Sequence, residues 1–150
     1  MQKLRLRTFV SRDEAFHIGR TNVPVSAPPL HTHDFAEVFW IESGTGLHLI
    51  NGRREPLVAG EVVFVQPSDV HGFQAKVAES FVLVNVAFEA GVLDWLRERY
   101  RPSALTGRVG AADIERLRLL SDALAVGAKS QLARDSFLLQ LLAMLTAEDR

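Results

Sequence analysis

The chain has 150 residues, 47% of them hydrophobic, and its 17 basic and 18 acidic residues give a formal net charge of −1. This length predicts one domain with its own core, and the near-zero charge excludes a domain-wide electrostatic surface for nucleic acid or anionic membranes. The lack of cysteine excludes disulfides and thiolate metal sites. No apolar run reaches the roughly 18 residues that span a bilayer, so we expect a soluble, cytoplasmic protein.

The N-terminal part of the chain shows weak strand patterns. Residues 2–9 alternate basic with apolar side chains, which predicts a half-buried strand. Residues 14–20 form a second, weaker strand candidate, and several prolines then lead into a histidine-rich segment.

Stronger strand and turn signals follow. The β-rich runs 36–42 and 46–50 are separated by Gly44, which predicts a hairpin. Asn51-Gly52 is the strongest short-range turn signal and predicts a second hairpin, after which Gly60 turns the chain into the next strand. The run 81–88 is apolar on both faces, so we expect helices or a partner to cover its outer side.

After residue 90 the apolar period becomes helical. The pattern predicts a short helix over 92–100 and two amphipathic helices over 111–126 and 130–147, with Gly127 at the turn between them. Strands first and helices afterwards predict a mainly β domain over residues 1–90, followed by a helical segment over residues 91–150.

Three histidines and one glutamate form the most informative pattern in the chain. His31, His33 and Glu37 all occupy odd positions, so a continuous strand would direct them to one face of a sheet. With the distant His71 they make a donor set that suits zinc, iron, manganese, nickel or copper better than calcium or magnesium. The alternative is that the same side chains line a polar pocket without metal. His48 lies between two leucines and is interpreted as a structural or surface histidine outside this site.

Apolar side chains near this site have two interpretations. Phe39, Phe64 and Phe73 are candidates for the wall of a ligand pocket, although aromatic residues on strands commonly belong to the core. Trp40 has the opposite parity to Glu37 and is expected at a subunit interface.

The residues around the four ligands resemble the cupin superfamily. The spacing from His31 to Gly44 is similar to the first cupin motif, and Gly60 to His71 is similar to the second, although Gln66 and Ser68 replace its proline and internal glycine. This resemblance implies an antiparallel double-stranded β-helix, or jelly-roll barrel, followed here by a C-terminal α-helical segment.

A narrower resemblance covers most of the chain. The segments His31–Val38, Gly44–Gly52 and Gly60–Phe73, together with the leucine-rich tail, resemble the N-terminal sensor domain of AraC-type transcription regulators, especially the rhamnose-regulator branch. The resemblance implies a small-molecule effector, often a sugar, a helical element that pairs two subunits into a homodimer, and DNA binding through helix-turn-helix units absent from this chain.

Two functional classes therefore remain open. The first is an effector-sensing and dimerisation module, in which no residue is catalytic. The second is a small metal-dependent enzyme of the dioxygenase or sugar-isomerase type, in which the four ligands would leave positions open for substrate. No nucleophile–base pair or phosphate-cradling loop supports another enzyme class.

Overall fold

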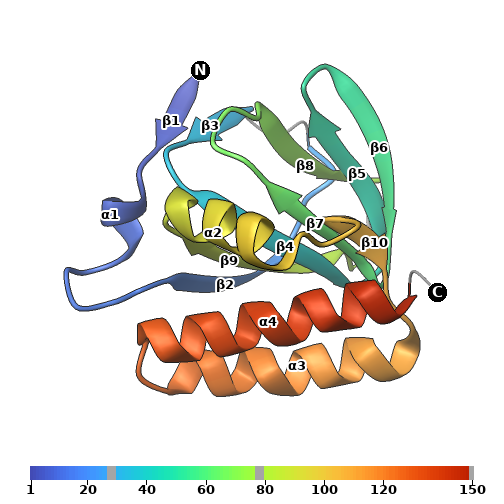
Figure 1. Cartoon of the computed structure of the whole chain (residues 1–150). Coiled ribbons are helices and arrows are strands. Elements are labelled where there is room, and N and C mark those ends of the chain that lie inside the picture. Colours follow the sequence, from blue (N-terminus) through green and yellow to red (C-terminus); the bar gives the residue numbers. More distant parts are fainter. Residues whose placement is uncertain (27–29, 77–79, 149–150) are drawn as a thin grey trace.

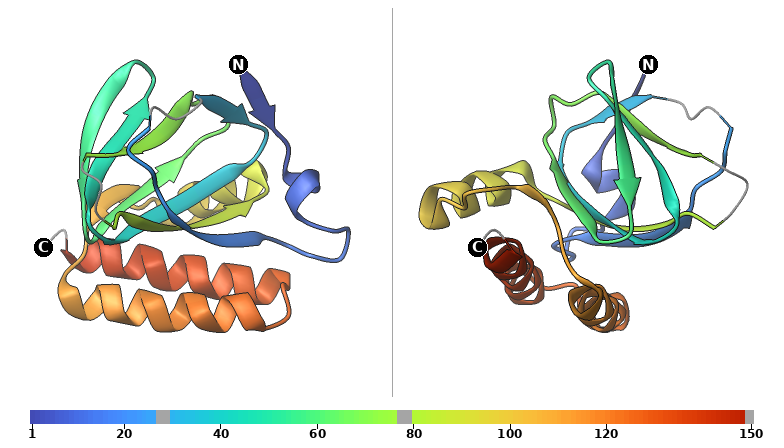
Figure 2. Two further views of the ribbon diagram at one scale, coloured as in Figure 1. Left: turned by 180° about the vertical axis from the view of Figure 1, so that it is seen from behind. Right: turned by 90° about the vertical axis from the view of Figure 1, so that its right-hand side faces the viewer.

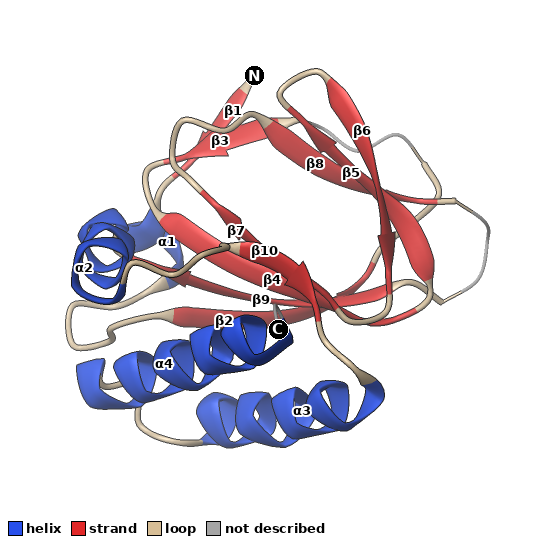
Figure 3. Ribbon diagram, turned by 45° about the vertical axis from the view of Figure 1, so that its right-hand side comes forward, coloured by secondary structure: helices blue, strands red, loops and turns tan. Residues whose placement is uncertain are grey.

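Two five-stranded β-sheets face each other, and helices pack on the outside of the second sheet (Figure 1, Figure 3). The computed structural model describes residues 1–26, 30–76 and 80–148. The first sheet has the order β1 (Gln2–Leu4), β3 (His31–His33), β8 (His71–Ala75), β5 (Thr45–Ile50) and β6 (Arg53–Val58); the second has the order β10 (Thr106–Arg108), β7 (Glu61–Val65), β4 (Ala36–Ser43), β9 (Val82–Phe88) and β2 (His17–Asn22). The predicted mainly β, cupin-like jelly roll with C-terminal helices is confirmed.

Strands that are neighbours in sequence often lie in different sheets. The predicted hairpin across Gly44 is wrong, because β4 pairs with β7 and β9 whereas β5 pairs with β6 and β8. The chain crosses between the sheets again at Gly60, whose φ is +94° and whose missing Cβ would lie 2.4 Å from the Val109 carbonyl oxygen. The predicted hairpin at Asn51-Gly52 is confirmed, and both turn residues have positive φ, as a type I′ turn requires.

The N-terminal segment departs from its sequence pattern. The predicted strand over residues 2–9 is wrong after Leu4, because helix α1 (Leu6–Phe9) follows. The backbone N–H of Leu6 donates a hydrogen bond of 2.8 Å to Asp34 Oδ1, and β1 runs parallel to β3. A contact with a segment 28 residues away therefore overrides the local alternation.

The second sheet separates two hydrophobic clusters. Phe39 and Ile41 point between the sheets, while Val38 and Trp40 point toward the helices, as the parity of β4 predicts. Trp40 has no exposed surface, and its ring centroid lies 5.6 Å from that of Phe137 on α4. The prediction that Trp40 lies at a subunit interface is wrong, because a helix of the same chain covers it.

The helices lie close to their predicted bounds: α2 (Ala90–Tyr100), α3 (Ala111–Val126) and α4 (Gln131–Glu148). Figure 2 shows α3 and α4 side by side as an antiparallel pair below the strands. The chain returns to the second sheet between α2 and α3, where β10 pairs with β7; this strand has no sequence signal. Among the described residues, no helix has the length and apolar character needed to cross a membrane.

Candidate metal and effector site

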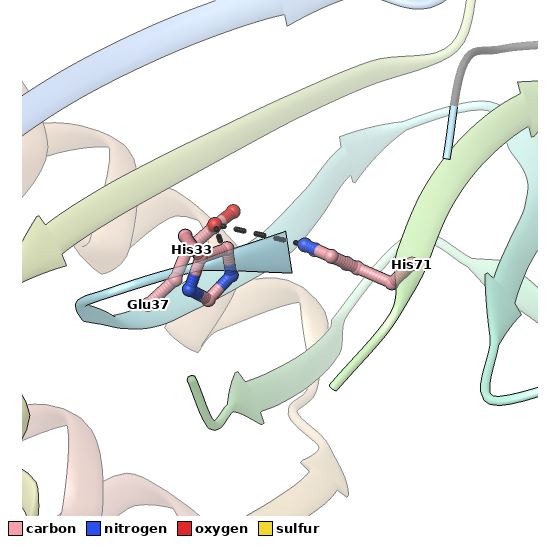
Figure 4. Close-up of side chains that lie close together, drawn as sticks. All are labelled: His33, Glu37 and His71. Carbon is pink, nitrogen blue, oxygen red and sulfur yellow. Dashed lines mark ion pairs between the residues drawn. The ribbon is translucent and has the colours of Figure 1, made fainter. Parts of the chain in front are cut away.

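Three of the four predicted metal ligands meet between the two sheets (Figure 4). His33 and His71 come from the first sheet, and Glu37 comes from β4 in the second. Glu37 Oε2 lies 3.5 Å from His33 Nε2 and 3.9 Å from His71 Nε2. The three side chains offer ligand atoms that all lie within 4.8 Å of one another, and all three residues are buried.

The convergence arises from a bend rather than from a continuous strand. The chain bends at Asp34 and Phe35, between β3 and β4, and passes from the first sheet to the second. The prediction of one strand face is therefore wrong. His33 and Glu37 meet because they lie on opposite sides of a corner that folds them toward each other.

Hydrogen bonds orient the two histidine rings. His33 Nδ1 donates to the Phe35 carbonyl oxygen at 2.6 Å, and because a carbonyl can only accept, the Nε2 atom of the neutral ring carries a lone pair. His71 Nδ1 lies 2.8 Å from His48 Nε2. Within the described part of the chain, the Nε2 atoms of His33 and His71 are buried without a hydrogen-bond partner. Unsatisfied buried nitrogens are costly, so this pair points to a bound ion or ligand.

Burial disfavours the charged form of all three side chains. It raises the pKa of the Glu37 carboxyl to about 7 and lowers the pKa of the His33 ring. Burial, followed by the neighbouring histidines, also holds the pKa of His71 far below its ordinary value. A divalent cation would supply the positive charge that this buried group lacks and would favour an ionised Glu37.

The remaining two histidines lie beside this group. His31 is not part of the three-residue cluster, but its ring centroid lies 4.6 Å from that of His71 across the β3–β8 pair. His48, placed outside the site by the sequence analysis, is 2% exposed and bonded to His71. No local sequence signal indicates that role, because it depends on the pairing of β5 with β8.

The structure brings together two of the three predicted pocket aromatics. The Phe39 ring lies edge-on to both His48 and Phe73, with centroids 4.9 Å and 4.8 Å away. Phe73 also stacks on His48 at 5.1 Å. Phe64 belongs to the cluster that faces the helices, on the other side of the second sheet.

The donor set fits a first-row transition metal. Ligand atoms about 2.1 Å from a tetrahedral ion lie roughly 3.4 Å apart, which is close to the separations around Glu37 Oε2. The hydrogen bonds that the two rings make with the Phe35 carbonyl oxygen and with His48 Nε2 are of the kind that orient metal-binding histidines. Three protein ligands would leave at least one position for water or an effector oxygen.

Comparison with known proteins agrees with this architecture. The chain is 35% identical over 74 residues to the HTH-type transcriptional activator RhaS of Mannheimia succiniciproducens, covering 49% of this chain and 28% of that protein. It is 42% identical over 82 residues to RhaS of Yersinia pestis strain Pestoides F, covering 55% of this chain and 29% of that protein. The matched regions thus span under a third of these relatives. The resemblance to rhamnose-regulator sequences is confirmed.

Similarity in fold extends over more of the chain. The crystal structure of an apo ToxT variant from Vibrio cholerae covers 89% of this chain and 54% of its own, with a TM-score of 0.56 and 14% identity. The family model described as AraC-like ligand binding domain matches residues 15–142. The chain therefore belongs to the family of AraC-like ligand-binding domains.

Proposed function

We propose that this chain is the effector-sensing and dimerisation domain of a transcriptional regulator, and that its effector is a small polyhydroxylated molecule such as a sugar. DNA would be bound by a helix-turn-helix domain outside this chain. The observation that supports the proposal best is the cluster of His33, Glu37 and His71, buried between the sheets of a domain whose family binds ligands.

The cluster has the chemistry to recognise hydroxyl groups. The free Nε2 atom of His33 accepts a hydrogen bond, while the Glu37 carboxyl donates when protonated and accepts when ionised. Phe73 is only partly buried, and its ring, with a centroid 5.4 Å from that of His71, would offer apolar surface to the C–H face of a sugar. Phe39 is fully buried and supports this ring and that of His48 edge-on. Ligand pockets commonly combine a few convergent polar groups with such apolar walls.

We also propose a divalent transition metal as a cofactor of this site. His33, Glu37 and His71 would hold the ion, and the ring centroid of His31, the fourth predicted ligand, lies 4.6 Å from that of His71. A bound ion would act as a Lewis acid toward an effector oxygen. Ligand types alone do not choose among zinc, iron, manganese, nickel and copper.

The helical segment supports homodimerisation. Leu119 and Val126 on α3 lie seven residues apart on one helix face and are 61% and 88% exposed, and Leu132 near the start of α4 is 81% exposed. Large exposed apolar side chains on neighbouring helices are typical of an interface. A symmetric pairing of this surface would bury it in both subunits.

Titration of the purified chain tests the effector proposal. Calorimetry with L-rhamnose, other hexoses and pentoses is run on protein stripped with EDTA and on protein loaded with zinc. Saturable binding by at least one sugar, lost in His33→Phe and retained in a matched surface variant, Arg116→Gln, would support the proposal. A lack of binding to both forms across the sugar panel would argue against a sugar effector.

Sedimentation analysis tests the dimer separately. We expect a concentration-dependent dimer that Leu119→Glu and Val126→Glu dissociate. A wild-type chain that remains monomeric at high micromolar concentration would refute dimerisation by this segment alone.

A second candidate function is a small metal-dependent enzyme. The unpartnered Nε2 atoms of His33 and His71 favour it, since they leave an ion with open positions for substrate or dioxygen. Turnover of sugars or small aromatics by metal-loaded protein, abolished in Glu37→Gln, would support this function over the sensor.

A further inference from the structure

The inner face of the second sheet carries polar side chains beyond the candidate metal ligands. The residues on either side of Asn85 in β9 belong to the cluster that faces the helices, so Asn85 itself points between the sheets. Figure 3 shows β9 beside β2, which is an edge strand of this sheet. Ile18 of β2 packs against the same outer cluster, so its neighbours His17 and Gly19 share the inward parity of Asn85.

Strand register aligns these residues with Glu37. Ala87 of β9 is the partner of Glu37 on β4 and of His17 on β2, so the three residues form one row across the inner face. Asn85 pairs with Gly19 in the next row. Paired residues of neighbouring strands project from the same face, and adjacent strands lie about 4.8 Å apart. Glu37 and His17 are therefore two strands apart, at opposite ends of a short row.

Gly19 marks the point where two polar atoms converge. A Cβ added at Gly19 would lie 3.1 Å from Asn85 Oδ1 and 3.5 Å from His17 Nε2. Both atoms therefore lie over the same stretch of bare backbone. The next floor residue, Ala87, contributes only a methyl group. A glycine inside a strand commonly marks a place where a ligand approaches the backbone closely.

Solvent reaches this part of the inner face. His17 and Asn85 are only partly buried, although both have inward parity, whereas Leu83, the next inward residue of β9, is 3% exposed. Within the described part of the chain, no hydrogen bond or ion pair engages the side chain of His17 or Asn85, and the His17 ring contacts that of Phe9 at a centroid distance of 5.4 Å. The two polar groups are thus accessible and available to a ligand.

The chemistry of the two groups suits neighbouring hydroxyls. The Asn85 amide offers both donors and an acceptor, and a neutral imidazole offers one of each. Burial lowers the pKa of His17, which keeps the ring neutral at neutral pH. A sugar hydroxyl both donates and accepts, so it can be matched by either side chain. Because neither group is charged, the pair favours hydroxyl groups over an ionic group.

We propose that Asn85 and His17 form a second polar subsite of the effector pocket, which reads the hydroxyl groups of a monosaccharide at the end away from the histidine cluster. Gly19 and Ala87 form its floor, and the sugar ring lies over Ala87 between Glu37 and His17. This subsite rests on the proposed sugar effector and names the residues that select among sugars. A site built to hydrogen-bond a hydroxyl rejects an analogue that lacks it.

Calorimetry on the full chain, metal-free and zinc-loaded, tests the subsite with L-rhamnose, other hexoses and pentoses. Asn85→Ala should weaken binding of the tightest sugar by about tenfold or more, while the free energy of unfolding in urea should not fall, because the amide has no protein partner to lose. His17→Ala should weaken binding several-fold, and His17→Gln, which restores a hydrogen-bonding group, should recover most of the loss. Arg116→Gln on α3 is the control and should keep the wild-type affinity.

Monodeoxy analogues of the tightest sugar identify the hydroxyl that Asn85 reads. The wild type should bind one of these analogues about tenfold more weakly than the parent sugar. Asn85→Ala should bind that analogue and the parent sugar equally, because the contact is already missing from the variant. Equal discrimination by the variant and the wild type against every analogue would overturn the assignment of Asn85.

The outcomes separate this subsite from the sugar effector itself. If the wild type binds a sugar and both Asn85→Ala and His17→Ala bind it as Arg116→Gln does, the subsite is refuted while the sugar effector stands. A loss of stability in Asn85→Ala that matches its loss of binding would show a structural amide and would also overturn the subsite. A wild type that binds no sugar of the panel would refute the effector and the subsite together.

Discussion

The raised pKa of the Glu37 carboxyl leads to a measurable dependence of stability on pH. We expect Glu37→Gln to be more stable than the wild type in metal-free protein at neutral pH. Because the pKa of this carboxyl rises from 4.5 to about 7 on folding, its protonated form is favoured in the folded state. The resulting stability is fully present below pH 4.5 and is lost as the pH rises through 7.

The size of this effect follows from linkage. At about 1.4 kcal/mol per pKa unit, the shift corresponds to about 3 kcal/mol. Glutamine resembles the protonated acid and does not titrate, so the free energy of unfolding of the variant should exceed that of the wild type by about this amount above pH 7. Below pH 4.5 the two proteins should be nearly equal.

Urea unfolding, followed by tryptophan fluorescence between pH 4 and pH 8 in EDTA, measures this difference. Burial lowers the pKa of His48 to about 4, so its contribution to stability is present above pH 6.5 and is lost as the pH falls toward 4. His48 titrates in both proteins, and this contribution cancels in the comparison. Glu98→Gln, which replaces an exposed carboxyl on α2, is the control and should change the free energy of unfolding by less than about 0.5 kcal/mol. A difference between Glu37→Gln and wild type that stays below 1 kcal/mol at every pH would show that Glu37 is ionised in the folded protein.

Three further perturbations test other parts of the structure. Zinc at a hundredfold excess over its dissociation constant should stabilise the wild type by about 2.7 kcal/mol. His48→Phe, which keeps a ring stacked on Phe73, should weaken zinc binding by about 10–100-fold without a similar loss of metal-free stability. Equal zinc affinities of variant and wild type in a competition titration would exclude His48 as a positioning residue. Gly60→Ala should lower the free energy of unfolding, measured by urea titration, more than Gly52→Ala does. Both glycines have positive φ, but only at Gly60 does a backbone oxygen lie 2.4 Å from the added Cβ. Equal losses of stability would mean that the structure relieves this contact. Leu141→Ala on α4 should cost about 2–5 kcal/mol because the side chain is fully buried, and a loss below 1 kcal/mol would contradict the packing of this helix on the sheet.

The parts of the fold that were predictable depend on local patterns. The helical period sets the bounds of α3, and the Asn51-Gly52 pair sets the turn between β5 and β6. The alternation in β4 separates the residues that face inward from those that face the helices. Each of these signals operates over a few residues, so a single sequence contains it.

The candidate site was only partly predictable for the opposite reason. Residue type and spacing selected His31, His33, Glu37 and His71 as donors, and the structure brings the last three together. Their convergence depends on the bend after β3, and the contact of His48 depends on strand register.

What the sequence determined by itself was therefore a strand-rich part followed by a helical segment after residue 90, the chemistry of the donor set and the resemblance to the family. Only the tertiary structure decided which strands pair, that α4 covers Trp40, that Phe64 faces the helices and that α1 follows β1. The physical reason is that strand pairing and the packing of helices on a sheet depend on burial and on hydrogen bonds between segments distant in sequence, such as the bond between Leu6 and Asp34.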